Sequence, residues 1–458
     1  MNLTGFLQWG IGFIIVLYLL VILIRRWNEL PLILLPLVWY LPEQTSEGRL
    51  LEDYMFIRWF TIVLIPVIIL IEILRRRHLF KTIVLGKILL VILIYVFFSV
   101  FSAMYNNISW IETLGYLAVY LRYPLFFILL INIDWEEKTT QKFVILFLVL
   151  IFLQFPEVLY RHYVLGITGD DISWSLGAWG TTNLGIYSIY ASCIIIAQGL
   201  HTGFTVWHII GIAIFFLFAL YGEIKSIVIW LPLTILVTFY FYPFKTRLKK
   251  YSVIFSALIL GIIFFQIFYK NWQKLHGRNI ATILQTTYLT LEGEVATETK
   301  YSAYRLGILL QVLDELRTDT KSLLLGEGPG SSLVGNFFSK PGRITQVVTG
   351  TKDTPNQIAS TLLDVGLVGI ILYYFILIGI VLTVWSKMRV SNSLCQSKLL
   401  KILKSAYPGI VFYYLIIGPL YHPVWRFDAA SYIFYFISAE IFRASNALTG
   451  NQANESTP

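Results

Sequence analysis

Apolar runs of about 20 residues, separated by short charged breaks, alternate along almost the whole chain. A helix of this length crosses a hydrocarbon core about 30 Å thick. The pattern therefore predicts an all-α polytopic membrane protein with about 13 transmembrane helices, in a range of roughly 12–14 because some runs are short or broken by proline. The expected spans are 3–24, 30–42, 54–74, 82–104, 113–133, 143–161, 184–200, 204–222, 224–243, 252–270, 357–384, 402–420 and 428–445.

One long interval between apolar runs, 271–356, falls late in the chain. It contains Leu306, Leu309, Leu313 and Leu316 at helical spacing, which predicts a short amphipathic helix on the membrane surface or against the bundle. We therefore expect an N-terminal bundle (1–270), a large outward loop with short helices (271–356), C-terminal membrane helices (357–445) and a disordered polar tail (446–458).

Basic residues cluster in alternate short loops, as in "RRRHLFK", "KTRLKK" and "SKMRVSNSLCQSKLLK". The positive-inside rule places these loops in the cytoplasm, with the C-terminus inside and the N-terminus and loop 271–356 outside. If residues 3–41 form a hairpin or a re-entrant pair, only the N-terminus changes side. The stretch 3–24 lacks a basic n-region and a small-residue cleavage site, so we expect a retained helix.

Composition agrees with this class, since 57% of the residues are hydrophobic, 13% are charged and mean hydropathy is +0.72. A soluble domain of this length is less apolar and more charged. Most of the net charge of +9 comes from the cytoplasmic loops, and nucleic acid is not an expected partner. Cys193 and Cys395 form no disulfide framework. Because no His or Cys cluster has metal-ligand spacing, we expect neither a metal nor another cofactor.

Five cations lie within or beside spans on the outward side, where the positive-inside pattern does not expect them. Each one either faces a polar cavity with a partner, or snorkels to headgroups or pairs with a nearby carboxylate, such as Lys225 with Glu223. As a set they predict a phosphate or pyrophosphate site, because arginine forks match phosphate oxygens. The five are Arg122, Arg161, Lys225, Arg305 and Arg426.

A glycine-rich stretch and two aromatic clusters are also expected on the outward side. In "LLLGEGPGSS", Gly326, Gly328 and Gly330 surround a proline and predict a tight turn that returns the loop to the membrane. The stretch is neither a P-loop nor a dinucleotide motif. Aromatic clusters such as "SWSLGAWG" and "FYYLIIGPLYHPVW" suit either sugar stacking or an interfacial belt.

The stretch "DTPNQIASTLLDVGLVG" opens the span that follows the loop. Asp353 or Thr354 is expected to cap the first turn, with Pro355 at an early helical position.

The span itself carries Asp364, Gly366 and Gly369, which a simple membrane crossing does not need. The two glycines predict that a neighbouring helix approaches closely.

Taken in order, these residues resemble the O-antigen ligase and Wzy-type polysaccharide polymerase superfamily, bacterial membrane enzymes of the glycosyltransferase C type. That family has a Ser-Arg-Gly-like turn, an Arg-bearing helix in a periplasmic loop, a "G-x-G-x-G" turn, and "H-N-x-x-L" before "x-x-G-x-x-G". The matches, which cover about the C-terminal half, are "IKS" at 224–226, "YRLGILL" around Arg305, "GEGPG" at 326–330 and "PNQIASTLLDVGLVG" at 355–369.

Two positions depart from the family pattern. Lys225 stands where the family often has arginine, which keeps the cation but loses the bidentate fork. Pro355 occupies the position of the family histidine, so the base usually invoked for ligases is absent. The resemblance therefore fits a polymerase better than a lipid A-core ligase.

The resemblance implies transfer of a glycan from undecaprenyl pyrophosphate to a hydroxyl of an acceptor lipid-linked repeat unit, without a cofactor, at the outer face of the bacterial cytoplasmic (inner) membrane. Expected partners are the lipid-linked oligosaccharide, the growing glycan chain, membrane lipids and, as a candidate, a chain-length regulator. The five cations would bind pyrophosphate, Arg122, Lys225 and Arg305 foremost. By the order of the motifs, Asp353 to Gln357 would line the outward site. Asp353, Asn356 and His422 are the candidates for the catalytic group, and His276 is a further outward imidazole.

Two other classes stay open. A lipid-linked glycan flippase is expected to have repeat-related halves, and no internal repeat is visible. A solute transporter is expected to place an ionisable site on broken helices near the midplane, for which Arg122 and Asp364 are the candidates.

Overall fold

The computed structural model describes residues 83–132, 135–167, 172–173, 180–222, 224–276, 305–332, 356–391, 397–421, 424–425 and 428–455, together with Glu29, Leu32 and Leu35. The predicted spans 3–24 and 54–74 lie outside the described residues, and of 30–42 only two residues are described.

All regular structure in the described part of the chain is helical. Every predicted span from 82–104 onward coincides with helix, which confirms the all-α class. Within the described ranges, six helical segments are long and apolar enough to cross a membrane, so the protein is membrane-embedded and the count of thirteen stays a prediction. The elements are α4 (Ile83–Tyr105), α5 (Trp110–Leu130), α6 (Glu137–Phe152), α7 (Gln154–Tyr163), α8 (Gly180–Thr202), α9 (Val206–Tyr221), α10 (Lys225–Phe241), α11 (Arg247–His276), α13 (Arg305–Leu316), α14 (Thr320–Leu325), α16 (Gln357–Ser391), α17 (Lys398–Phe412), the π-helix η5 (Tyr413–Ile417), α18 (Gly418–Tyr421) and α19 (Asp428–Glu455).

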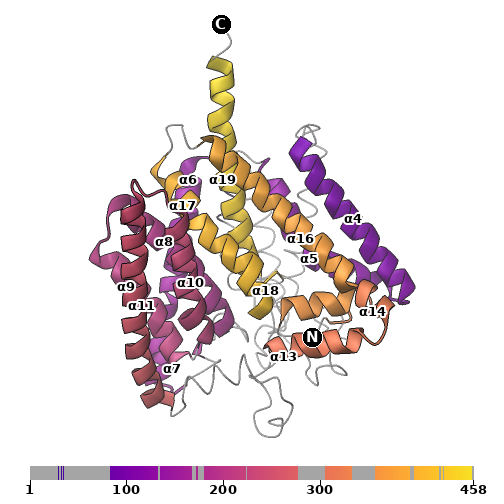
Figure 1. Cartoon of the computed structure of the whole chain (residues 1–458), viewed down its shortest axis with the longest axis horizontal. Helices are drawn as coiled ribbons and strands as arrows, with labels where there is room; N and C mark the ends of the chain where they lie inside the picture. Colours follow the sequence, from indigo (N-terminus) through magenta and orange to yellow (C-terminus); the bar gives the residue numbers. More distant parts are fainter. Residues whose placement is uncertain are drawn as a thin grey trace, which may run out of the picture.

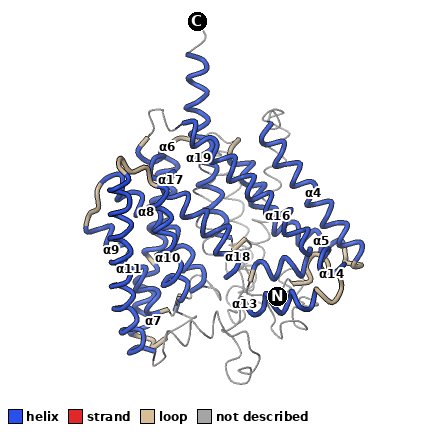
Figure 2. Tube along the Cα trace, in the orientation of Figure 1, coloured by secondary structure: helices blue, strands red, loops and turns tan. Residues whose placement is uncertain are grey.

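The helices form two groups joined by a central pair (Figure 1). Helices α6 to α11 lie on one side, α4, α5 and α16 on the other, and α17 and α19 pack between them. Helices α13 and α14, from the predicted outward loop, lie at the end of the bundle opposite the C-terminus (Figure 2). Their position agrees with short helices that pack against the bundle.

Helix α13 packs against the first turns of α16 with a face that overlaps the predicted one. Ile308, Val312 and Leu316 are buried, whereas Leu309 and Leu313 are only partly buried. The leucine spacing therefore predicted the helix correctly, and Ile308 and Val312 extend its buried face against Ala359, Leu362 and Leu363.

Two tyrosines of α16 satisfy carbonyl groups that prolines leave without a donor. Pro124 inside α5 has no N–H for the carbonyl of Tyr120, and the Tyr373 hydroxyl donates to that oxygen at 3.2 Å. In the same way, Pro419 cannot serve the carbonyl of Leu415, which accepts from the Tyr374 hydroxyl at 3.1 Å. Helix α16 thus supplies a donor at the proline positions of both α5 and α18.

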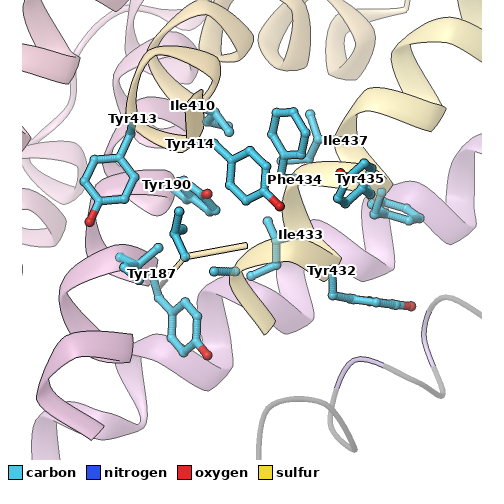
Figure 3. Packing of buried hydrophobic residues seen from close by; sticks show 14 of the residues in the cluster. Tyr187, Tyr190, Ile410, Tyr413, Tyr414, Tyr432, Ile433, Phe434, Tyr435 and Ile437 are labelled. Carbon is cyan, nitrogen blue, oxygen red and sulfur yellow. The ribbon is translucent and has the colours of Figure 1, made fainter. Parts of the chain in front are cut away.

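Many aromatic rings fill the interior rather than an exposed surface. Figure 3 shows Tyr190 of α8, Tyr413 and Tyr414 of η5, and Phe434 of α19 packed together, with Tyr414 stacked on Phe434 at 4.0 Å. The Tyr414 hydroxyl bonds Ser431 at 2.9 Å, as buried tyrosines usually require. The described rings of "FYYLIIGPLYHPVW" are therefore mainly core, and "SWSLGAWG" lies outside the described residues apart from Ser173 and Gly180.

Candidate functional site

Asn356 ends the predicted outward loop and caps α16. Its side-chain Oδ1 accepts from the backbone N–H groups of Ile358 at 2.9 Å and Ala359 at 3.1 Å. Its Nδ2 donates to the carbonyl of Leu420 in α18 at 2.7 Å. The cap is therefore this residue, two positions after Thr354 and three after Asp353, and its amide is engaged in holding two helices together.

A buried polar cluster joins the start of α16 to α5. Gln357 Nε2 donates to the Tyr120 hydroxyl at 2.9 Å and to Thr361 Oγ1 at 3.2 Å. These donor bonds assign the amide orientation, and Gln357 Oε1 accepts no hydrogen bond from the residues that the structure describes. Gln357 is fully buried, so at the beginning of the helix stands an acceptor atom to which none of the described residues donates.

The cluster continues along α5 toward α4. The rings of Tyr116 and Tyr120 lie 4.4 Å apart, and the hydroxyl of Tyr116 bonds that of Tyr95 at 2.7 Å. All three residues have no exposed surface. The bond between the Tyr95 and Tyr116 hydroxyl groups joins α4 to α5, and the ring contact between Tyr116 and Tyr120 connects this pair to the cluster at the start of α16.

Arg122 lies two residues beyond Tyr120 on α5. It is only 1% exposed, and its guanidinium carbon lies 4.7 Å above the ring of Tyr123. Twelve residues separate it from the start of α5, which is about 18 Å along the helix axis. A guanidinium at this depth is costly in a membrane protein, and this is the usual mark of a functional site.

The glycine turn, residues Gly326–Ser332, docks onto α16 at a break in that helix. Gly366 has φ 64° and ψ −169°, so the helix is interrupted after Val365. Asp364, fully buried, accepts from the backbone N–H of Ser332 at 2.8 Å and from its hydroxyl at 2.6 Å. The N–H of Glu327 donates to the carbonyl of Leu363 at 2.7 Å. The predicted turn therefore exists, and it returns the loop to α16.

Gly326 and Gly366 allow the two backbones to touch. A Cβ added to Gly326 would lie 2.6 Å from the backbone nitrogen of Gly366, and one added to Gly366 would meet the carbonyl oxygen of Leu324. Gly366 thus permits close approach of a turn, where we predicted a helix. Gly369 does face a helix, because its Cβ would lie 3.4 Å from Phe98 of α4.

Helix α4 holds the other side of the glycine turn. Ser102 Oγ donates to the carbonyl of Leu325 at 2.7 Å, and Asn106 Nδ2 donates to that of Gly326 at 3.2 Å. Gly328 presses against Ile108, and Gly330 lies near Glu112. All three predicted glycines therefore belong to a turn wedged between α4, α5 and α16.

The remaining predicted site residues lie in other helices or outside the described residues. Arg161 belongs to α7, which packs mainly on α6 and α9, and its neighbour Tyr163 bonds the Tyr221 hydroxyl at 2.8 Å. Lys225 and Arg305 are the first residues of α10 and α13, and their side chains lie outside the described atoms, as does that of His276. The predicted residues that fall entirely outside the described residues are Asp353, His422 and Arg426.

Tyr120, Thr361 and Ser332 are site residues that the sequence analysis did not identify. Thr361 had a readable signal, because Gln357, Thr361 and Asp364 follow the i, i+4, i+7 spacing of one helix face. Ser332 had none, since its partner lies 32 residues away.

The chain matches no protein-family model and none of the curated proteins with which it can be compared. The chemistry of the site thus rests on its own residues. Arg122 can bind an anion, and Gln357 can accept a hydrogen bond from a hydroxyl.

Proposed function

We propose that the protein is a bacterial polysaccharide polymerase. It transfers a glycan from undecaprenyl pyrophosphate to a hydroxyl of an acceptor lipid-linked repeat unit, at the outer face of the cytoplasmic membrane. The observation that carries the proposal is the buried guanidinium of Arg122, next on α5 to the residues that anchor the start of α16. Such a cation stabilises a pyrophosphate leaving group.

Other residues supply the second half of the chemistry in this proposal. The acceptor hydroxyl must be aligned and must lose its proton. Gln357 Oε1, which accepts no hydrogen bond from the described residues, aligns that hydroxyl. Asp353 is the carboxylate nearest in sequence and acts as the base, while Lys225 and Arg305 add positive charge, as the order of motifs suggests.

Transport is the second candidate, and one observation favours it. Transporters bind ions at breaks in membrane helices, and α16 is broken next to the buried carboxylate of Asp364. However, the glycine turn occupies this break and donates two hydrogen bonds to the carboxylate. We therefore place transport behind glycan transfer.

The test uses purified protein with its native lipid-linked repeat unit, followed for a ladder of longer glycans and release of undecaprenyl pyrophosphate. Arg122→Ala is expected to abolish the ladder, and Arg122→Lys to restore part of it because the charge returns without the fork. The matched control is Arg317→Ala, since Arg317 is 66% exposed on the protein surface.

Three results would count against a polymerase. A single transfer to a different lipid acceptor would indicate a ligase. Binding of the lipid-linked glycan without transfer would support a flippase, and uptake of a solute into vesicles a transporter. An Arg122→Ala protein with normal chain growth would remove the guanidinium from the mechanism.

A further inference from the structure

The break in α16 raises the question of what fixes its first segment, residues 357–365. In an unbroken helix the backbone hydrogen bonds set the direction of every turn. At Gly366 the backbone leaves the helical conformation, so the rest of α16 does not by itself set the direction of the first segment. Contacts from other elements must do so.

The segment is held at both of its ends. At the start, Asn356 bonds the carbonyl of Leu420 and Gln357 bonds the hydroxyl of Tyr120. At the end, the glycine turn contributes the two bonds from Ser332 to Asp364 and the bond from Glu327 to the carbonyl of Leu363. Among the hydrogen bonds of the described residues given above, those from the glycine turn lie beside the break.

We propose that Asp364 is a positioning residue. Its carboxylate binds Ser332 and so holds the glycine turn in the break. The turn in turn fixes the position of the first segment of α16, which begins with Gln357. An apolar side chain at this position would leave the N–H and hydroxyl of Ser332, which is itself fully buried, without an acceptor. The role of Gln357 in aligning the acceptor hydroxyl rests on the proposed function. The docking of the glycine turn by Asp364 does not.

The test separates geometry from charge. Asparagine at position 364 can accept from the Ser332 N–H through Oδ1 and donate to its hydroxyl through Nδ2, so Asp364→Asn keeps both bonds without the charge. Asp364→Ala loses both, and Ser332→Ala loses only the hydroxyl bond. We expect Asp364→Asn to retain chain growth, Asp364→Ala to lose it, and Ser332→Ala to fall between them.

We expect the loss of positioning in Asp364→Ala to lower kcat rather than to raise KM. Arg122, which holds the donor in the proposed function, lies on α5 and not on the displaced segment. We therefore expect Asp364→Ala to lower kcat about 100-fold, as misplacement of a reacting group does, with KM for the lipid-linked donor little changed. Rates are normalised to the protein that still binds donor, so partial misfolding does not imitate the effect.

A second measurement does not depend on activity. Ser331 in the seated turn is 2% exposed, so a Ser331→Cys reporter in a Cys395→Ser background should resist a membrane-impermeant maleimide. Adding Asp364→Ala should expose the reporter, and adding Asp364→Asn should not.

Each other result has a definite meaning. Asp364→Asn with a protected reporter but no chain growth would show that Asp364 acts by its charge, which overturns the positioning role. An exposed reporter with unchanged kcat in Asp364→Ala would overturn it too. If the wild-type protein transfers no glycan while the labelling follows the expected pattern, the proposed function fails and the seating of the turn stands.

Discussion

Substitution of Gly366 by alanine tests the docking of the glycine turn most directly. With φ 64° and ψ −169°, this position has a backbone conformation that is essentially restricted to glycine, and alanine there costs about 1–3 kcal/mol. The new Cβ would also meet the carbonyl oxygen of Leu324 and lie 2.5 Å from the nitrogen of Gly326. Overpacking of this kind costs a further 1–3 kcal/mol or so. We expect a loss of about 2–6 kcal/mol in the free energy of unfolding.

The matched control is Gly86→Ala in α4, where an added Cβ meets nothing within 4 Å. Alanine is a better helix former than glycine, so this control should stabilise the protein by about 0.5–1 kcal/mol. Thermal unfolding midpoints of both variants in one detergent provide the assay. A Gly366→Ala protein that melts with the wild type, or shifts in the same direction as Gly86→Ala, would refute the close approach of the two backbones.

Two further predictions concern hydrogen bonds. Tyr373→Phe should lower the free energy of unfolding by about 1–3 kcal/mol because the Tyr120 carbonyl loses its donor; combining it with Pro124→Ala, which restores a backbone N–H, should recover much of this loss in the same melting assay. Asp319 caps α14 by accepting from the N–H of Lys321, which lowers the pKa of its carboxyl group. The cap should stabilise α14 above the ordinary carboxyl pKa and lose this effect as pH falls through the lowered value. The protection of the Lys321 amide, which is its exchange rate relative to that of an unstructured peptide at the same pH, should therefore fall in acid, and in Asp319→Asn this pH dependence should disappear.

The helices were predictable from sequence because the signal is local. Each predicted span from 82–104 onward depends only on the apolar residues of that stretch, and each coincides with helix. The start of α16 was placed less exactly, since "DTPN" offers several capping side chains and only the contact with Leu420 selects Asn356.

The arrangement of the site depends on contacts between distant residues. Asp364 and Ser332 are 32 positions apart, and Gln357 and Tyr120 are 237 apart. No spacing rule relates such positions. The sequence did show that a carboxylate and two glycines within an apolar span are not needed for a simple membrane crossing. The docked turn accounts for Asp364 and Gly366 together.

The polar groups at the break in α16 and those at its start differ in whether they already have hydrogen-bond partners. A broken membrane helix exposes backbone groups that hydrocarbon cannot satisfy, and a transporter uses them to hold its ion. Here Glu327 and Ser332 from the same chain already satisfy Leu363 and Asp364 at the break, so an ion would have to displace them. At the start of α16, by contrast, Oε1 of Gln357 accepts no hydrogen bond from a described residue. A reacting group needs an atom that can still bind a ligand, so this acceptor at the start of α16 is the feature that agrees with the proposed glycan transfer, whereas the filled break does not agree with transport.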